Sequence, residues 1–301
     1  MVEDVSTLTS PATGKAYSIA MICRVWGVAR SSVYAARQQR AISSEARRRG
    51  PPPACPDDVL KDEIREVLSA SDFHSEGYRK VWARLRKKDI RTSKDRVRRV
   101  MREAGLSAPH FPTRTHGNKA HDGRITKDHP DEMWGTDATS TMTRQGNATI
   151  FIAVDHCTAE CVGIHAALKG DRFEALEPIY QGVREIFGQV DAGAATGLAL
   201  RHDHGSQYTS HYFQDEMRFL GIKTTASFVA EPECNGVAER FIRTLKEQLL
   251  WLQNFDTIEE LRLALLDFKH RYNNGWLVQK HGHITPNQAR AKLKPLPAQA
   301  A

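Results

Sequence analysis

The stretch that decides the fold is residues 131–168, DEMWGTDATSTMTRQGNATIFIAVDHCTAECVGIHAAL. It contains short runs rich in apolar and β-branched residues, and turn residues such as the Gln-Gly-Asn at 145–147 separate them. Runs of this length and composition are typical of β-strands joined by tight turns. We therefore predict an antiparallel meander of three strands at residues 133–143, 149–157 and 161–168.

The chain that follows this meander alternates between helical and strand-like segments. Two helical segments, 171–187 and 210–220, alternate with two short strand-like runs, 197–202 and 223–227. Alternation of this kind adds parallel strands to a sheet and packs helices on its faces. The predicted fold class is therefore α/β, with a mixed five-stranded sheet and helices in a domain at residues 131–295.

Three acidic residues occupy different parts of this predicted domain. Asp137 lies in the first strand and Asp203 at the end of the fourth, with 65 residues between them, and Glu239 follows after 35 intervening residues on a predicted helix, 236–254. Neighbouring strand ends are where α/β sheets place their sites. Converging carboxylates repel one another unless cations neutralise them, and hard oxygen ligands favour Mg²⁺ or Mn²⁺. The pattern predicts a metal-dependent phosphoryl-transfer enzyme.

Two alternatives bear on this triad. Asp155 is also an acid at a predicted strand end, so it could take the place of Asp137. On the predicted helix, Arg243 and Lys246 share a face with Glu239, which is also the pattern of an ordinary intrahelical ion pair. Together with the two aspartates, the pattern favours a site where Lys246 and Arg243 bind DNA phosphate near the metals.

The motifs around the acids resemble a known family. WGTD at 134–137, HDHGSQYTS at 202–210 and CNGVAERFIRTLK at 234–246, with the 35-residue second gap, resemble the D,D(35)E pattern of integrase-type transposases. The similarity is to the OrfB product of the insertion-sequence-three (IS-three) family and covers roughly residues 57–295. Many members carry a triplet such as HSD where this chain has Arg-His-Asp at 201–203, and the block before the glutamate is shorter than the commoner GNCYDNAVAE.

This resemblance implies a ribonuclease H-like catalytic core and a DNA transposase or integrase. The activity would be metal-dependent cleavage at transposon ends and strand transfer into target DNA, with two Mg²⁺ (or Mn²⁺) ions per site held by Asp137, Asp203 and Glu239. It also implies an OrfA partner or a fusion with it, and joining two ends implies a homo-oligomer on double-stranded DNA. Residues expected to support the site are His202, His204, Gln207, Tyr208 and Asn235.

Two other functions stay open at this point. A nuclease of the same fold that cuts RNA–DNA hybrids could use similar acids, but it would not need upstream basic modules. A domesticated, non-catalytic DNA-binding protein is less compatible with an intact triad.

The N-terminal half predicts two all-α modules of helix-turn-helix type. In the first, within residues 1–43, two short helices flank Gly27, and the second helix would direct residues toward DNA. A helical hairpin that only packs is the alternative. The residues expected to face DNA are Ser31, Ser32, Tyr34 and Arg37. Consecutive prolines then predict an extended linker at 44–56.

The second module is predicted at residues 57–106, with three helices. Its third helix has an apolar stripe, Val97, Val100, Met101 and Ala104, which must face a core. The opposite side carries cations that would bind DNA: Lys94, Arg98, Arg99 and Arg102. A basic surface helix without DNA contact is the alternative. A linker at 107–130 and a tail at 296–301 complete the predicted organisation.

Charge and composition agree with a DNA-binding protein. Residues 1–130 contain 26 Lys/Arg and 15 Asp/Glu, whereas residues 131–301 contain 17 and 21, so the basic charge gathers in the N-terminal part. The five cysteines include no C-x-x-C pair, which argues against a disulfide framework and a Cys-rich zinc site. No stretch approaches 18 uninterrupted apolar residues, so we expect no membrane span and a cytoplasmic, nucleoid-associated protein.

Overall fold

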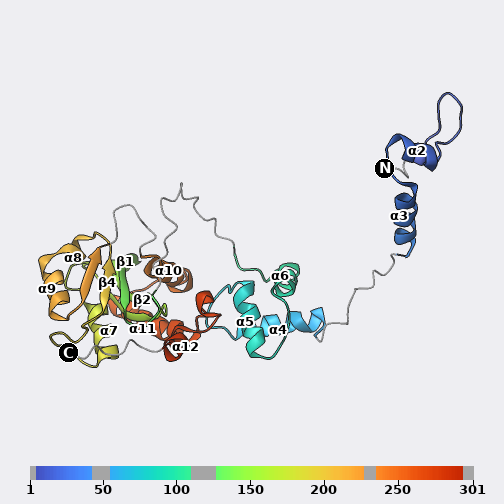
Figure 1. Cartoon of the computed structure of the whole chain (residues 1–301). Coiled ribbons are helices and arrows are strands. Elements are labelled where there is room, and N and C mark those ends of the chain that lie inside the picture. The colour runs from blue at the N-terminus through green and yellow to red at the C-terminus, as the bar shows by residue number, and fades with distance from the viewer. Residues whose placement is uncertain (1–4, 43–54, 110–126, 227–234, 294–301) are drawn as a thin grey trace. The chain divides into compact units, whose positions relative to one another are not determined.

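This computed structural model describes residues 5–42, 55–109, 127–226 and 235–293 (Figure 1). The chain divides into two compact units, residues 1–54 and 55–301. No helix in the described part is both long and apolar enough to cross a bilayer. The predicted linkers at 44–56 and 107–130 and the tail at 296–301 lie mostly or wholly outside the described residues, and their boundaries stay predictions.

The first unit contains two helices at the predicted places, α2 (Ile19–Val25) and α3 (Arg30–Ile42). The Ser18 hydroxyl accepts a hydrogen bond from the Met21 amide at 3.3 Å and so caps the start of α2. Gly27, in the turn between the helices, has a φ of +65°, a left-handed conformation that glycine adopts without steric cost.

The second unit begins with a three-helix bundle, which consists of α4 (Asp57–Ser69), α5 (Tyr78–Lys87) and α6 (Lys94–Glu103). Each helix turns an apolar stripe inward because its apolar residues recur every three or four positions. The buried cluster that results consists of Leu60, Ile64, Val67, Val81, Leu85, Val97, Val100 and Met101.

The rest of this unit contains a five-stranded sheet of order β3-β2-β1-β4-β5. The strands are β1 (Met133–Thr143), β2 (Gly146–Asp155), β3 (Cys161–Ala167), β4 (Ala199–His202) and β5 (Lys223–Ala226). The first three pair antiparallel, whereas β4 pairs parallel with β1 and β5 parallel with β4. This confirms the predicted mixed sheet of the ribonuclease H-like fold.

Both faces of the sheet are covered, because side chains alternate along the central strand β2. Ile150, Ile152 and Val154 belong to one core cluster, together with residues of α10 (Gly236–Leu245) and α11 (Ile258–Gly275). Phe151 and Ala153 belong to the other, with residues of α7 (Glu177–Phe187) and α9 (His211–Phe219). The shorter helices are α8 (Ser206–Thr209), η3 (Gln279–His281) and α12 (Pro286–Lys292).

Three predicted boundaries in the sheet domain differ from the structure by three residues or more. Strand β2 begins at Gly146 rather than at 149, because a tight turn after Thr143 pairs these two residues directly. The helix predicted from residue 171 begins at Glu177, since Pro178 has no amide hydrogen and fits only the first turn of a helix. The helix predicted at 236–254 is α10 followed by a π-helical turn, η2 (Lys246–Leu250), which ends it four residues early.

The bundle contacts the sheet domain through the loop between α4 and α5. Phe73 in this loop is buried with the domain's core, and its ring lies edge-on to Trp276 with centroids 5.0 Å apart. The His74 backbone accepts from and donates to the Gln248 side chain of η2, at 3.0 and 2.8 Å. Apolar burial and hydrogen bonds thus both join the bundle to the sheet domain.

Candidate active site

The sheet places two of the predicted acids side by side. Gly135 of β1 lies opposite Arg201 of β4, and the charge of Asp203, two residues after Arg201, acts on Asp137, two residues after Gly135. Asp137 is half-buried, and one of its oxygens accepts from the Ala138 amide at 2.8 Å. Asp203 is exposed just beyond β4. The parallel pairing of β1 and β4 therefore brings together two acids that are far apart in the sequence.

The third acid, Glu239, is held near β1 by the start of its helix. Asn235 precedes α10 and is buried, and its side-chain amide donates to the Thr136 carbonyl oxygen at 2.8 Å. Glu239 follows one turn later and is exposed. The backbone next to Asp137 is thus tied directly to the start of the helix that carries Glu239.

Electrostatics show that the charges of Asp203 and Glu239 act on Asp137. The pKa of Asp137 is raised to about 6, mainly by burial and also by the negative charges of Asp203 and Glu239, whereas the Ala138 amide and Lys246 oppose the rise. Within the four described ranges, however, no three His, Cys, Asp or Glu side chains are spaced to hold a metal ion. The charges of Asp203 and Glu239 thus reach Asp137, but joint coordination of a metal by the three acids stays a prediction.

The chemistry of these side chains fits a divalent cation. Repulsion from Asp203 and Glu239 contributes to the raised pKa of Asp137, so the negative charge gathered here is incompletely compensated. A hard cation would relieve that repulsion and would meet only carboxylate oxygens, the ligands that Mg²⁺ and Mn²⁺ prefer.

Asn235 packs against Gly135, where any side chain would displace neighbouring atoms. A side chain at Gly135 would begin 2.3 Å from the Asn235 amide oxygen and 2.8 Å from a ring nitrogen of His156. That amide oxygen is buried and has no hydrogen-bond partner in the described part of the chain. Gly135 therefore permits the close approach of α10 to β1, and only the glycine in WGTD hints at this in the sequence.

His202 contacts the backbone of Asp203. Its ring is buried, which lowers its pKa, and Nδ1 lies 2.6 Å from the Asp203 carbonyl oxygen. A neutral ring that donates from Nδ1 would fix the backbone of Asp203. His204 is exposed.

Tyr208 and Gln207 form part of the support beneath the site. Tyr208 is fully buried, and its hydroxyl lies 3.4 Å from that of Thr136, which donates to the Ile152 carbonyl oxygen at 2.9 Å. The Gln207 side chain also hydrogen-bonds to Tyr208, and burial raises the tyrosine pKa. These contacts join α8 to the strand that carries Asp137, which fits the supporting role predicted for both residues.

The alternative first acid, Asp155, is used elsewhere. It is fully buried at the end of β2, where it accepts from the Asp131 amide at 2.9 Å and from the Thr158 amide and hydroxyl at 2.7 and 2.8 Å. Its oxygens stabilise a turn, so the structure favours Asp137.

The two cations predicted near Glu239 differ in their surroundings. Lys246 is half-buried and lowers the pKa of Asp137, so it lies within electrostatic reach of the acids. Arg243 is exposed and pairs with Glu247 at 2.8 Å.

The N-terminal residues predicted to contact DNA are spread over two helices. On α3, Ser31, Ser32, Tyr34 and Arg37 are exposed. On α6, Lys94, Arg98 and Arg102 are also exposed, whereas Arg99 forms ion pairs with Asp57 at 2.6 Å and Glu103 at 3.0 Å. The spacing on α6 could not reveal this difference, because Asp57 lies 42 residues upstream.

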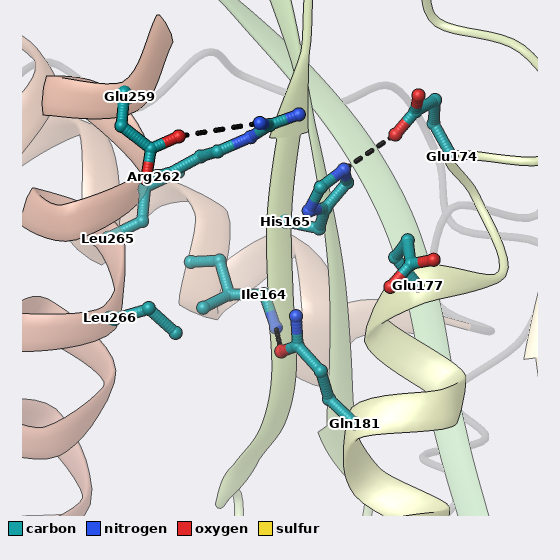
Figure 2. A pocket seen from close by; sticks show the side chains of 9 residues that line it. All are labelled: Ile164, His165, Glu174, Glu177, Gln181, Glu259, Arg262, Leu265 and Leu266. Carbon is teal, nitrogen blue, oxygen red and sulfur yellow. Dashed lines mark hydrogen bonds and ion pairs between the residues drawn. The ribbon is translucent and has the colours of Figure 1, made fainter.

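A separate pocket of about 410 Å³ lies between β3, α7 and α11 (Figure 2). Its polar side chains pair with one another: His165 Nε2 lies 2.6 Å from a Glu174 oxygen, and Arg262 lies 3.5 Å from Glu259. Because β3 is at the edge of the sheet and β1 is at its centre, this pocket is distinct from the acid site.

Comparisons with known proteins point to the same chemistry. A family described as "HTH-like domain" matches residues 56–111, and one described as "Integrase core domain" matches residues 220–286. The chain is 25% identical over 282 residues to the transposase for insertion sequence element IS629 of Shigella sonnei, covering 91% of each. It is 28% identical over 182 residues to transposase InsD for insertion element IS2A/D/F/H/I/K of Escherichia coli, covering 58% of this chain and 60% of that relative.

Solved structures also resemble parts of the chain. The catalytic core domain of BIV integrase covers 54% of this chain and 95% of its own length, with 20% identity and a TM-score of 0.39. The HTLV-2 integrase catalytic core domain in complex with magnesium covers 56% and 99%, with 17% identity and a TM-score of 0.40.

Proposed function

We propose that this chain is a DNA transposase of the IS-three family and that Asp137, Asp203 and Glu239 are its catalytic carboxylates. Such an enzyme is a polynucleotidyl transferase that cleaves and joins phosphodiester bonds. One observation carries the assignment of residues: Asp203, just beyond β4, and Glu239, on α10, both raise the pKa of Asp137 in β1. The fold thus gathers three negative charges that a simple scaffold would keep apart.

Two Mg²⁺ or Mn²⁺ ions per site would be held by these three residues. When bound, the ions would neutralise charge that develops on the reacting phosphate and activate the attacking oxygen. The raised pKa of Asp137 supports this proposal, because a cation would favour the ionised form of all three acids.

The reaction would consist of two displacements at phosphorus. In the first, a water oxygen bonds to phosphorus at an element end as the bond to the 3′ oxygen breaks, and the leaving oxygen takes up a proton. In the second, the freed 3′-hydroxyl attacks a target phosphodiester and displaces another 3′ oxygen. No covalent bond to the enzyme forms, so one site can carry out both steps.

The residues around the triad would hold it in place during both displacements. Lys246 would bind a DNA phosphate beside Asp137. Asn235 would keep α10 against β1, and His202 would hold the backbone of Asp203.

The partners of this reaction follow from its substrates. Double-stranded DNA would supply both the element ends and the target, and holding two ends together calls for a homo-oligomer. An OrfA protein or a fusion with it would help to recognise the ends. We place the protein in the cytoplasm with the nucleoid, where its substrate lies.

Replacing Asp203 by Asn tests the assignment. We expect Asp203→Asn to lose Mg²⁺-dependent joining of oligonucleotides that carry the element's ends, while gel-shift affinity for those ends stays within several-fold. Asp215→Asn, at an exposed aspartate of α9 that pairs with Arg218, is the matched control and should join normally. Retained joining by Asp203→Asn would reject the triad. Cleavage of RNA–DNA hybrids in preference to element ends would favour the nuclease.

A further inference from the structure

Two groups of basic side chains in the three-helix bundle differ in their surroundings. In the first group, each cation is paired with an acid of the same bundle. Arg96 and Arg99 pair with Asp57, at 2.5 and 2.6 Å. Lys88 and Arg84 are paired in the same way, with Glu63 and Glu66 and with Glu76 respectively. The charge of this group is therefore largely neutralised within the protein.

The second group lies over two aromatic rings of α5. Arg79 and Arg98 lie 5.3 and 5.8 Å from the centre of the Tyr78 ring. Arg86 and Lys94 lie 5.1 and 4.5 Å from the centre of the Trp82 ring. All four cations are exposed, and no ion pair to any of them occurs among the described residues. We call these four cations and two rings the aromatic-backed face.

The rings of this face are themselves fixed. Tyr78 and Trp82 are half-buried and lie one turn apart on α5, and the Trp82 indole donates to the Thr92 carbonyl oxygen at 2.9 Å. A ring attracts a cation without cancelling its charge, and an exposed cation–π contact contributes only about 0.5–1 kcal/mol. The rings can thus limit the conformations of long side chains while leaving their positive charge available to an external anion.

We infer that the aromatic-backed face binds the phosphate backbone of DNA. The inference rests on the proposed transposase function and changes the predicted set of DNA-binding residues. Lys94 and Arg98 stay in it, Arg79 and Arg86 of α5 join them, and Arg99 leaves because Asp57 and Glu103 already neutralise it. Duplex DNA carries one charge per about 1.7 Å of axis, so four cations on adjoining helices can each meet a phosphate.

The face would position the duplex without reading its sequence. The proposed contacts of these four cations are to phosphate groups, and phosphate contacts carry no direct sequence information. Removing a cation of this face should therefore weaken binding to element ends and to unrelated duplexes alike.

The salt dependence of DNA binding tests the inference. Fluorescence anisotropy of the full chain with a labelled duplex, in EDTA so that no cleavage occurs, gives the slope of log affinity against log salt. The slope becomes shallower by about 0.9 for each phosphate that the protein no longer neutralises. We expect Lys94→Ala/Arg98→Ala to make it shallower by about 2 and to weaken binding roughly tenfold at moderate salt for both kinds of duplex. Arg79→Ala/Arg86→Ala should do the same.

Arg99→Ala is the matched control, because it removes one cation from the same helix and leaves Arg96 to pair with Asp57. We expect its slope and affinity to equal those of the wild type, and circular dichroism melting should confirm that all variants fold. Wild-type slopes in both double variants, or a shallower slope in Arg99→Ala, would overturn the inference.

Failure of the proposed function would look different. A wild-type protein that binds duplexes through this face but never joins ends with Mg²⁺ would refute the transposase assignment and leave the DNA-binding face intact.

Discussion

The ionised side chain of Asp137 lowers the stability of the folded protein. Its pKa is about 6, against an ordinary value of 3.8, because burial disfavours its charged form and two other carboxylates act on it. The folded state therefore binds more protons than the unfolded state between these two pH values. Without a divalent ion, Asp137 lowers stability as pH rises through this window, and the cost is fully present above pH 6.

Replacing Asp137 by Asn should remove this cost. In EDTA at pH 8, we expect the variant to unfold with a free energy higher than that of the wild type by on the order of 2 kcal/mol. The difference should shrink as pH falls below 4, where the carboxyl is neutral in both states. Urea titrations at both pH values measure it, and a difference independent of pH would contradict the raised pKa.

Gly135 lies beside the acid site, where an added side chain has no room. A methyl group there would lie 2.3 Å from the Asn235 oxygen and would push α10 away from β1. We expect Gly135→Ala to lower stability by about 1–3 kcal/mol, as overpacking does, and to reduce joining more than DNA affinity. Denaturation and joining assays on one preparation test this.

The control for this substitution lies at the start of α10. At Gly236 an added methyl group meets no atom within 4 Å, and an alanine suits a helix better than glycine. Gly236→Ala should therefore be neutral or stabilising by up to about 1 kcal/mol. Equal effects of the two alanines would show that crowding against Asn235 is not the cause.

At the scale of elements, β3 is an edge strand whose outward backbone groups are occupied. The Ile164 amide donates to the Gln181 side chain at 3.0 Å (Figure 2), and the Ala166 carbonyl oxygen accepts from Arg262 at 2.8 Å. Further along, the Val162 carbonyl oxygen accepts from Lys269 at 3.0 Å. Side chains of α7 and α11 thus fill positions where another strand could pair.

Removing two of these side chains should leave backbone groups of β3 unpaired, so that a strand of another molecule can pair with them. We expect Gln181→Ala/Arg262→Ala to associate with increasing concentration and to scatter light at a lower temperature than the wild type. Arg218→Ala, which removes a cation from an exposed pair on α9, is the control and should behave as the wild type. A double variant that stays monodisperse under the conditions where the wild type does would refute this role.

The sequence predicted the elements themselves better than their junctions. Local runs and periods indicated all five strands and the bundle helices, because those signals lie within each segment. The π-helical turn at 246–250 was missed, since a change from α to π hydrogen bonding does not alter the apolar residues. The contact between Asn235 and Gly135 was missed because it joins residues 100 positions apart.

At the scale of the whole second unit, Lys80 is buried where the bundle meets the sheet domain. Its amine lies 2.6 Å from the centre of the Trp276 ring and has no hydrogen-bond partner in the described part of the chain. The pKa of Lys80 is lowered to about 6, mainly by burial and also by the charge of Arg84, whereas the charges of Glu76 and Glu247 oppose the shift. Between pH 6 and 10.5 the unfolded chain therefore holds a proton that the folded chain lacks.

The lysine should make stability rise with pH across this window, because the cost of burial is greatest where the amine would be charged. We expect Lys80→Met to be more stable than the wild type at pH 6.5, with a smaller difference at pH 9.5. Guanidinium titrations at both values measure the difference. Lys61→Met, a substitution on α4 at a lysine outside this junction, is the control and should show no such trend. A difference that grows with pH would contradict the lowered pKa.

The hydrogen bonds of Gln248 to the His74 backbone join the bundle to the same continuous helical segment that carries Glu239. Glu239 and Gln248 are nine positions apart, which corresponds to about 13 Å along a helix. A bound duplex that displaced the bundle would either shift this helical segment or lengthen the hydrogen bonds between Gln248 and His74. Binding of DNA by the bundle, as proposed, would therefore affect the position of the third carboxylate relative to the other two.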